Sequence, residues 1–231
     1  FIIIIVFLVL SCELRKKKAR KKIIRRIFVM VFVGVVLLVS VLHYRYSALG
    51  IDASNINARS HPLMQYDEEH LVFDVFGDKL GFPVAAFSGY LSQGYYGLSL
   101  SMQQPFEWTY FTGNSYSLSV FLQRYLNIPV DYRKTYPYRA ALVTGWDDSK
   151  WSTAFAWYAG DLTFVGTLFM FFLVAFFYAK AWREAYLYKN PISIVLFTMV
   201  TIGLGYIPAT SQLFHSPGSF MAIFYFMILW A

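Results

Sequence analysis

Residues 90–102 have the sequence Tyr90-Leu-Ser-Gln-Gly-Tyr-Tyr-Gly-Leu-Ser-Leu-Ser-Met102, at the centre of an uncharged run that extends from Leu80 to Phe106. The run is too rich in Ser, Gln, Gly and Tyr to face lipid throughout, and it is too apolar for a free aqueous loop. This mixture favours a segment that lies in a membrane interface, or re-enters the membrane, and packs against protein.

The composition around this run is typical of a membrane protein. Of the 231 residues, 58% are hydrophobic, 20% are aromatic and only 14% are charged, which argues against an ordinary soluble globular protein. Because the sequence begins at Phe1 and ends at Ala231 inside apolar runs, we expect a fragment of a longer chain. We predict an all-α, polytopic integral membrane protein with a large, partly helical external loop.

The net charge of +7 is unevenly distributed along the chain. Nine of the 20 basic residues lie between Arg15 and Arg26, and the remaining eleven face thirteen acidic residues. A basic cluster between two apolar segments is typical of a cytoplasmic loop, so we favour this interpretation over nucleic-acid binding. Cys12 is the only cysteine, so we expect no disulfide within this chain.

The order of apolar and charged segments predicts three regions. Residues 1–42 would hold two transmembrane helices joined by the basic loop at 11–26, residues 43–152 a large periplasmic loop, and residues 153–231 three transmembrane helices. The expected spans after the first are Ile27–Leu42, Leu162–Lys180, Ile192–Tyr206 and Phe220–Ala231, the last one truncated. Trp151–Tyr158 would be interfacial, and Ile207–Ser219 a short external turn.

The basic residues also predict whether the uncharged run crosses the membrane. Both the first basic loop and the segment Lys180–Lys189 favour the cytoplasmic side. An even number of spans must therefore separate them, and Ile27–Leu42 and Leu162–Lys180 already supply two. We expect the run from Leu80 to Phe106 not to cross.

The central stretch also carries a family resemblance. Phe87-Ser-Gly-Tyr-Leu-Ser-Gln-Gly-Tyr-Tyr-Gly-Leu-Ser-Leu-Ser-Met102, Pro105-Phe-Glu-Trp-Thr-Tyr110 and Gly113-Asn-Ser115 resemble the large external loop of the Wzy-type polymerases of O-antigen and capsular repeat units. The stretch from Trp146 to Gly166 is similar too. The resemblance covers roughly residues 52–206, and the tyrosine-glycine block is its strongest part.

The resemblance implies a multi-pass glycosyltransferase of the bacterial inner membrane, of which this chain is the C-terminal portion. Such an enzyme joins undecaprenyl-pyrophosphate-linked oligosaccharide repeats on the periplasmic face. It uses no nucleotide sugar, metal or cofactor. The implied partners are the lipid-linked oligosaccharide, the lipid bilayer and a chain-length regulator protein, with no nucleic acid.

A pyrophosphate leaving group requires cations, and arginine binds phosphate through two parallel hydrogen bonds. The predicted external segment offers Arg124, Arg133, Lys134 and Arg139. We assign Arg133 and Arg139 to catalysis, and Arg124 and Lys134 to substrate binding. The alternative is a solvated basic patch that touches lipid phosphates.

Sugar binding requires aromatic faces beside hydroxyl and amide groups. We assign Tyr90, Gln93 and Tyr96 to substrate binding, and Trp108 and Tyr110 supply the same chemistry. The alternative for each is an aromatic belt at the membrane surface.

Three glycines lie among these residues. Gly89, Gly94 and Gly97 would permit a bend or a close approach of another backbone. Ordinary packing of helices through small residues is the alternative.

The acceptor hydroxyl of a glycosyl transfer requires a base. We assign Asp161 and His215 as catalytic candidates, with Glu107 and the pair Asp147–Asp148 as further carboxylates. Asp161 would equally serve as the cap of a helix N-terminus, and His215 as an ordinary surface histidine.

Two alternative functions remain open at this point. An O-antigen ligase also uses a lipid-linked glycan but transfers it to the lipid A core. A flippase would move the lipid-linked sugar without chemistry, and it should have broken helices with polar residues at the midplane of the membrane.

Overall fold

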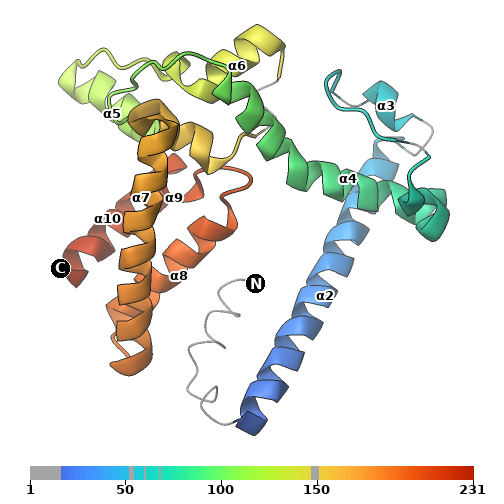
Figure 1. The fold of residues 1–231 in the computed structure, drawn as a ribbon, viewed down its shortest axis with the longest axis horizontal. Coiled ribbons are helices and arrows are strands. Elements are labelled where there is room, and N and C mark those ends of the chain that lie inside the picture. Colours follow the sequence, from blue (N-terminus) through green and yellow to red (C-terminus); the bar gives the residue numbers. More distant parts are fainter. Residues whose placement is uncertain (1–16, 52–54, 60, 68, 147–150) are drawn as a thin grey trace. The chain divides into compact units, whose positions relative to one another are not determined.

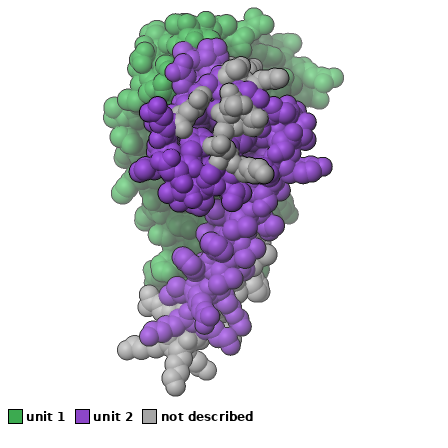
Figure 2. All heavy atoms as spheres, turned by 90° about the vertical axis from the view of Figure 1, so that its right-hand side faces the viewer, with its two compact units in different colours: residues 1–14, 93–231 green, residues 15–92 purple. Residues whose placement is uncertain are grey.

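The computed structural model describes residues 17–51, 55–59, 61–67, 69–146 and 151–231. Every regular element in these ranges is a helix (Figure 1), which confirms the all-α prediction for this part of the chain. The helices belong to two compact units, one within residues 15–92 and one within residues 93–231 (Figure 2). Helix α4 (Leu71–Met102) contributes to both units.

Two described helices are long and apolar enough to cross a membrane. One is Ile24–Ala48 within α2 (Lys17–Ala48), and the other is α7 (Ala154–Leu187). Helices α8 (Pro191–Gly205) and α10 (Pro217–Trp230) are apolar but have only 15 and 14 residues. A straight crossing needs about 20 residues, so the predicted multi-span arrangement stays a prediction.

The helix ends differ from the predicted segment boundaries. Residues 17–26, expected to lie in a loop, form the first turns of α2, and this helix continues beyond Leu42 to Ala48. Lys and Arg are good helix formers, so a basic segment need not interrupt a helix. Helix α7 begins at Ala154 rather than Leu162 and ends at Leu187, and the expected turn at 207–219 contains the short helix α9 (Gln212–His215).

The unit within residues 15–92 has a small apolar core beneath the first half of α4. Its buried residues are Ile56 of α3 (Ile56–Arg59), Phe73, Phe82 and Ala86. The ring of Tyr46 packs edge-on against Phe82, with the ring centroids 5.1 Å apart. Gly77 (φ 65, ψ 168) kinks α4, so the bend in this helix lies before the glycines that the sequence suggested for it.

The unit within residues 93–231 contains the last turns of α4 and the remaining helices. These are α5 (Tyr116–Leu126), the 3-10 turn η2 (Tyr132–Lys134), α6 (Tyr136–Thr144), and α7 to α10. Helices α7, α8 and α10 pack around the buried residues Ala181, Leu196, Phe197 and Ile223. Glu184 links all three helices, because its carboxylate accepts hydrogen bonds from Ser193 and from the indole of Trp230.

The surroundings of α7 change at Thr163, where the backbone leaves the helical conformation (φ 61, ψ 168). Before this break, most residues between Ala154 and Asp161 are buried. After it, seven large apolar side chains between Val165 and Phe177 are 42–78% exposed. An apolar surface of this extent is typical of a segment that lipid or another protein covers.

Candidate functional site

The candidate site forms where the end of α4 meets two non-helical segments. The N–H of Thr153 donates to the carbonyl of Gly94 at 3.3 Å, and the N–H of Ala154 donates to Ile207 at 2.9 Å. A Cβ atom at Gly94 would lie 1.8 Å from the carbonyl oxygen of Pro208. Glycine is therefore required here for the close approach of two backbones, one of the roles that the sequence leaves open.

Gly97, one turn further along α4, has the same role. An added Cβ would lie 3.0 Å from the indole nitrogen of Trp146 and 3.1 Å from the carbonyl oxygen of Trp151. Neither partner is in a helix, so packing of two helices through small residues does not explain Gly94 or Gly97. The two glycines let a helix contact the loops that carry the tryptophans.

These contacts enclose a pocket of about 310 Å³, which we call the aromatic pocket. Its volume lies at the lower end of the usual range for small-molecule sites, roughly 300–1,000 Å³. It is lined by Gly97, Tyr132, Pro137, Tyr138, Ala140, Trp146, Trp151, Ser152, Trp157, Thr210 and His215. The residues come from α4, η2, α6, α7, α9 and the segments between them, so the pocket exists only in the folded unit.

Aromatic rings pack against one another around this pocket. Tyr132 stacks on Trp157 with centroids 5.8 Å apart, and Trp157 meets His215 edge-on at 5.4 Å. Tyr96 packs against Trp146 at 4.9 Å from outside the lining set. The walls therefore have fixed ring orientations, which is the arrangement that a flat apolar face of a ligand can stack against.

Three polar atoms of the lining side chains are buried and have no hydrogen-bond partner among the described residues. They are Ser152 Oγ, Trp157 Nε1 and His215 Nδ1. A buried polar atom without a partner costs about 1–3 kcal/mol, so three in one pocket indicate that a polar ligand or water fills it. Burial also lowers the pKa of His215, and the imidazole is therefore neutral at pH 7.

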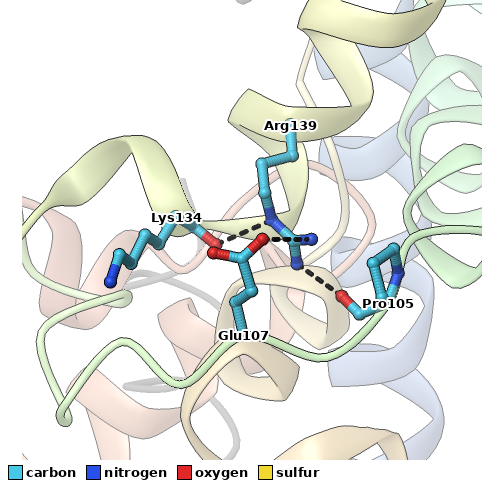
Figure 3. Close-up of polar contacts among 4 residues, drawn as sticks. All are labelled: Pro105, Glu107, Lys134 and Arg139. Carbon is cyan, nitrogen blue, oxygen red and sulfur yellow. Dashed lines mark hydrogen bonds and ion pairs between the residues drawn. The ribbon is translucent and has the colours of Figure 1, made fainter.

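Arg139, predicted to be catalytic, is held by the protein itself (Figure 3). Its guanidinium donates to the carbonyl oxygens of Lys134 at 3.0 Å and Pro105 at 2.7 Å, and to the Glu107 carboxylate at 3.2 Å. It also lies over the ring of Tyr136, 5.0 Å from the centroid. Each of the three guanidinium nitrogens donates a hydrogen bond within the protein, and the side chain is only 12% exposed. Arg139 therefore links the segment after α4 to α6.

Asp161 is likewise surrounded by internal donors. Its carboxylate accepts hydrogen bonds from the hydroxyl of Thr109 and, at 3.4 Å, from Nδ2 of Asn114. The backbone N–H groups of Phe111 and Gly113 add two more. A general base needs a lone pair that the substrate can reach, so this geometry favours Asp161 as a positioning residue for the loop 109–114.

The alternative role suggested for Asp161, as a helix cap, is wrong. The hydroxyl of Thr163 accepts the N–H of Gly166 at 3.3 Å, so Thr163 caps the helical segment that follows the break. Asp161 lies two residues earlier, inside the preceding turn of α7.

The remaining predicted residues do not form one cluster. Arg124, Arg133 and Lys134 are exposed, Gln93 is buried, Tyr96 is 39% exposed, and Tyr90 belongs to the unit within residues 15–92. Of the residues assigned from the sequence only His215 lines the aromatic pocket, with Tyr96 and Arg133 beside lining residues. The pair Asp147–Asp148 lies outside the described residues.

Sequence reasoning missed Ser152, Trp157, Tyr132 and Tyr138 as pocket residues. The available signal was the spacing of Trp146, Trp151 and Trp157 on the approach to an apolar segment, which the sequence analysis interprets as a membrane belt and as part of the family resemblance. Comparison with protein-family models, curated proteins and solved structures finds no match to this chain.

Proposed function

We propose that the chain is part of a membrane glycosyltransferase that polymerises undecaprenyl-pyrophosphate-linked oligosaccharide repeat units into O-antigen or capsular polysaccharide. The observation that carries this proposal is the aromatic pocket, where fixed tryptophan and tyrosine rings accompany three buried polar atoms without partners. A sugar is complementary to this pocket, because its apolar ring face can stack on the aromatic rings and its hydroxyl groups can bond to the polar atoms.

His215 is the residue best suited to activate an acceptor hydroxyl. Its ring is held against Trp157 in the pocket, and its neutral form can accept a proton at pH 7. In the proposed step, His215 takes the hydroxyl proton while the acceptor oxygen bonds to the anomeric carbon of the donor. The bond from that carbon to the phosphate oxygen breaks, and undecaprenyl pyrophosphate leaves with the electron pair.

Arg133 and Lys134 are the proposed contacts of the pyrophosphate. They directly follow Tyr132, a pocket residue, and their side chains are exposed. Unlike Arg139, neither has a side-chain hydrogen bond or salt bridge to a described residue. A cation beside a sugar pocket would hold a phosphate attached to the bound sugar.

The proposed location is the bacterial inner membrane, with the aromatic pocket on the periplasmic side. The exposed apolar surface of α7 after Thr163 and the apolar helix Ile24–Ala48 support insertion into a bilayer. The basic residues at the start of α2 support a cytoplasmic position for that end.

The test uses the full-length protein in proteoliposomes that contain undecaprenyl-pyrophosphate-linked oligosaccharide. Trp157→Phe removes one hydrogen-bond donor and keeps a ring, so we expect about a tenfold loss of polymer. His215→Gln removes the base, and a loss of about 10²–10⁴-fold is expected. Trp182→Phe is the matched control, because Trp182 lies 25 residues further along α7, half-exposed and stacked on Tyr186.

If both pocket variants form polymer at the wild-type level, the aromatic pocket has no role in the reaction. Product formed only on a lipid A core acceptor would identify a ligase. Movement of the intact lipid-linked sugar across the bilayer without new glycosidic bonds would identify a flippase.

A further inference from the structure

The segment Phe106–Phe111, which we call the aromatic loop, exposes large rings on a backbone that is tightly fixed. Trp108, Tyr110 and Phe111 are 45%, 53% and 61% exposed. The ring of Trp108 lies 4.6 Å from that of Tyr110 and 5.7 Å from that of Phe111. The three rings therefore form one apolar group at the surface, and none of them lines the aromatic pocket.

The backbone of the aromatic loop is strained and is held in that state. Tyr110 and Phe111 both have positive φ angles, 53° and 60°, which side chains other than glycine adopt rarely. On one side Arg139 binds Pro105 and Glu107. On the other side Thr109 is 2% exposed and binds both the carbonyl of Gly160 and the carboxylate of Asp161. Strain of this kind persists only where the surroundings enforce it.

The attachment point places the aromatic loop beside the apolar surface of α7. Thr109 is bonded to Gly160 and Asp161, and the exposed apolar surface begins at Val165. The four residues from Asp161 to Val165 include the break at Thr163, and they span at most about 14 Å even when fully extended. The loop therefore lies at the level where the buried first turns of α7 give way to its exposed apolar face.

The charge of the aromatic loop is also compatible with a position at the edge of the exposed apolar face of α7. Glu107 is the only charged residue between Phe106 and Phe111, and its carboxylate is paired with Arg139 at 3.2 Å. Tryptophan and tyrosine are the residues enriched where a bilayer meets water. A neutralised loop of Trp, Tyr and Phe at the end of an apolar helix has the composition of a membrane-interface anchor.

We propose that the aromatic loop inserts into the polar–apolar interface of a lipid bilayer and fixes the depth of the pocket-bearing unit beside it. The occupant of this surface is the bilayer, because the loop is bonded to α7 at Gly160 and Asp161, just before the exposed apolar face begins at Val165, and carries no unpaired charge. Asp161 and Arg139 are positioning residues that hold the rings outward. The inference rests on the proposed insertion of α7, but it does not depend on the glycosyltransferase reaction.

The experiment places an environment-sensitive fluorophore on single cysteines in a Cys12→Ser background, with the full chain in lipid nanodiscs. Phe111→Cys probes the loop, Phe172→Cys probes the exposed face of α7, and Glu69→Cys, in the acidic segment 67–69, is an exposed control to which no role is assigned. Quenching by spin-labelled lipid and by aqueous iodide is measured at each position.

A spin label near the lipid headgroups should quench the fluorophore at position 111 at least threefold more strongly than at position 69. Aqueous iodide should quench position 69 more strongly than position 111. In an Asp161→Asn background the loop loses its anchor, and lipid quenching at position 111 should fall by half or more while position 172 is unchanged.

Two results would overturn the inference, and they are distinguishable. If position 172 is quenched by lipid while position 111 behaves like position 69, the aromatic loop lies in water and α7 is still inserted. If position 172 is also quenched only by iodide, α7 does not lie in the bilayer. Both the proposed insertion of α7 and the proposed insertion of the aromatic loop are then refuted.

Discussion

Replacing Arg139 tests whether this residue stabilises the fold or acts on the substrate as a catalytic cation. The guanidinium makes two hydrogen bonds to backbone carbonyls, at 3.0 and 2.7 Å, and one ion pair with Glu107 at 3.2 Å. Glu107 is 45% exposed, so the ion pair contributes at most about 1 kcal/mol. Hydrogen bonds from a charged donor contribute about 1.5–3 kcal/mol each. Arg139→Ala should therefore cost about 3 kcal/mol, and Glu107→Gln less than about 1 kcal/mol.

The assay is thermal unfolding of purified protein in detergent, combined with polymer yield per folded molecule. A chain of this size loses about 2–4 °C of Tm per kcal/mol, so Arg139→Ala should lower Tm by about 6–12 °C and Glu107→Gln by less than about 4 °C. Arg139→Lys keeps the charge but loses the planar arrangement of donors, and it should fall between the two. Polymer yield per folded molecule should change little in all three.

The opposite pattern would refute this reasoning. If Arg139→Ala unfolds within about 2 °C of the wild type and yet makes no polymer, Arg139 acts on the substrate rather than on the protein. A large loss of stability with Glu107→Gln would show that the ion pair, and not the bonds to Lys134 and Pro105, provides the clamp.

Two further predictions concern the walls of the aromatic pocket. Gly94→Ala places a Cβ atom 1.8 Å from the Pro208 carbonyl and should destabilise the protein by about 1–3 kcal/mol or more, whereas Gly218→Ala, with no atom within 4 Å, should not lower Tm. Burial lowers the pKa of His215, so its neutral form favours the folded state. The contribution of neutral His215 to folding stability should be complete above the unfolded pKa of about 6.5 and should decrease as the pH falls below that value. Equal slopes of Tm against pH for His215→Gln and the wild type between pH 7 and pH 5 would contradict this.

The sequence predicted those features that depend on short-range chemistry. Helical class follows from apolar runs and residue propensities, and it is confirmed for the described residues. For Gly94 and Gly97 the sequence offered close approach, which only glycine tolerates, and ordinary helix packing as alternatives, and the contacts of the folded chain decide between them. Helix ends were predicted less well, because α7 incorporates the aromatic residues from Phe155 to Tyr158 that were expected to precede it. The rings of Trp157 and Tyr158 contact residues from distant segments, Tyr132, Phe214 and His215.

The partners of Arg139 and Asp161 could not be predicted because they are far away in the chain. Arg139 lies 32 residues after Glu107, and Asp161 lies 52 residues after Thr109. A charged residue in an external segment has the same local signature whether it meets a ligand or a carbonyl oxygen. Only the three-dimensional arrangement distinguishes a positioning residue from one that touches a substrate.

This distinction changes how the basic cluster at Arg133–Arg139 is to be understood. The sequence groups three cations within seven residues, but the fold divides them: Arg139 is bound to carbonyl oxygens and Glu107, whereas Arg133 and Lys134 stay exposed next to Tyr132 of the pocket. Since η2 is capped by Asp131, whose side chain accepts the N–H of Arg133 at 2.9 Å, the backbone that carries these two cations is itself fixed. The bond from Arg139 to the Lys134 carbonyl fixes it from the other end. In the proposed enzyme, Arg139 therefore stabilises the fold around this turn, and Arg133 and Lys134 are the residues that would bind the phosphate.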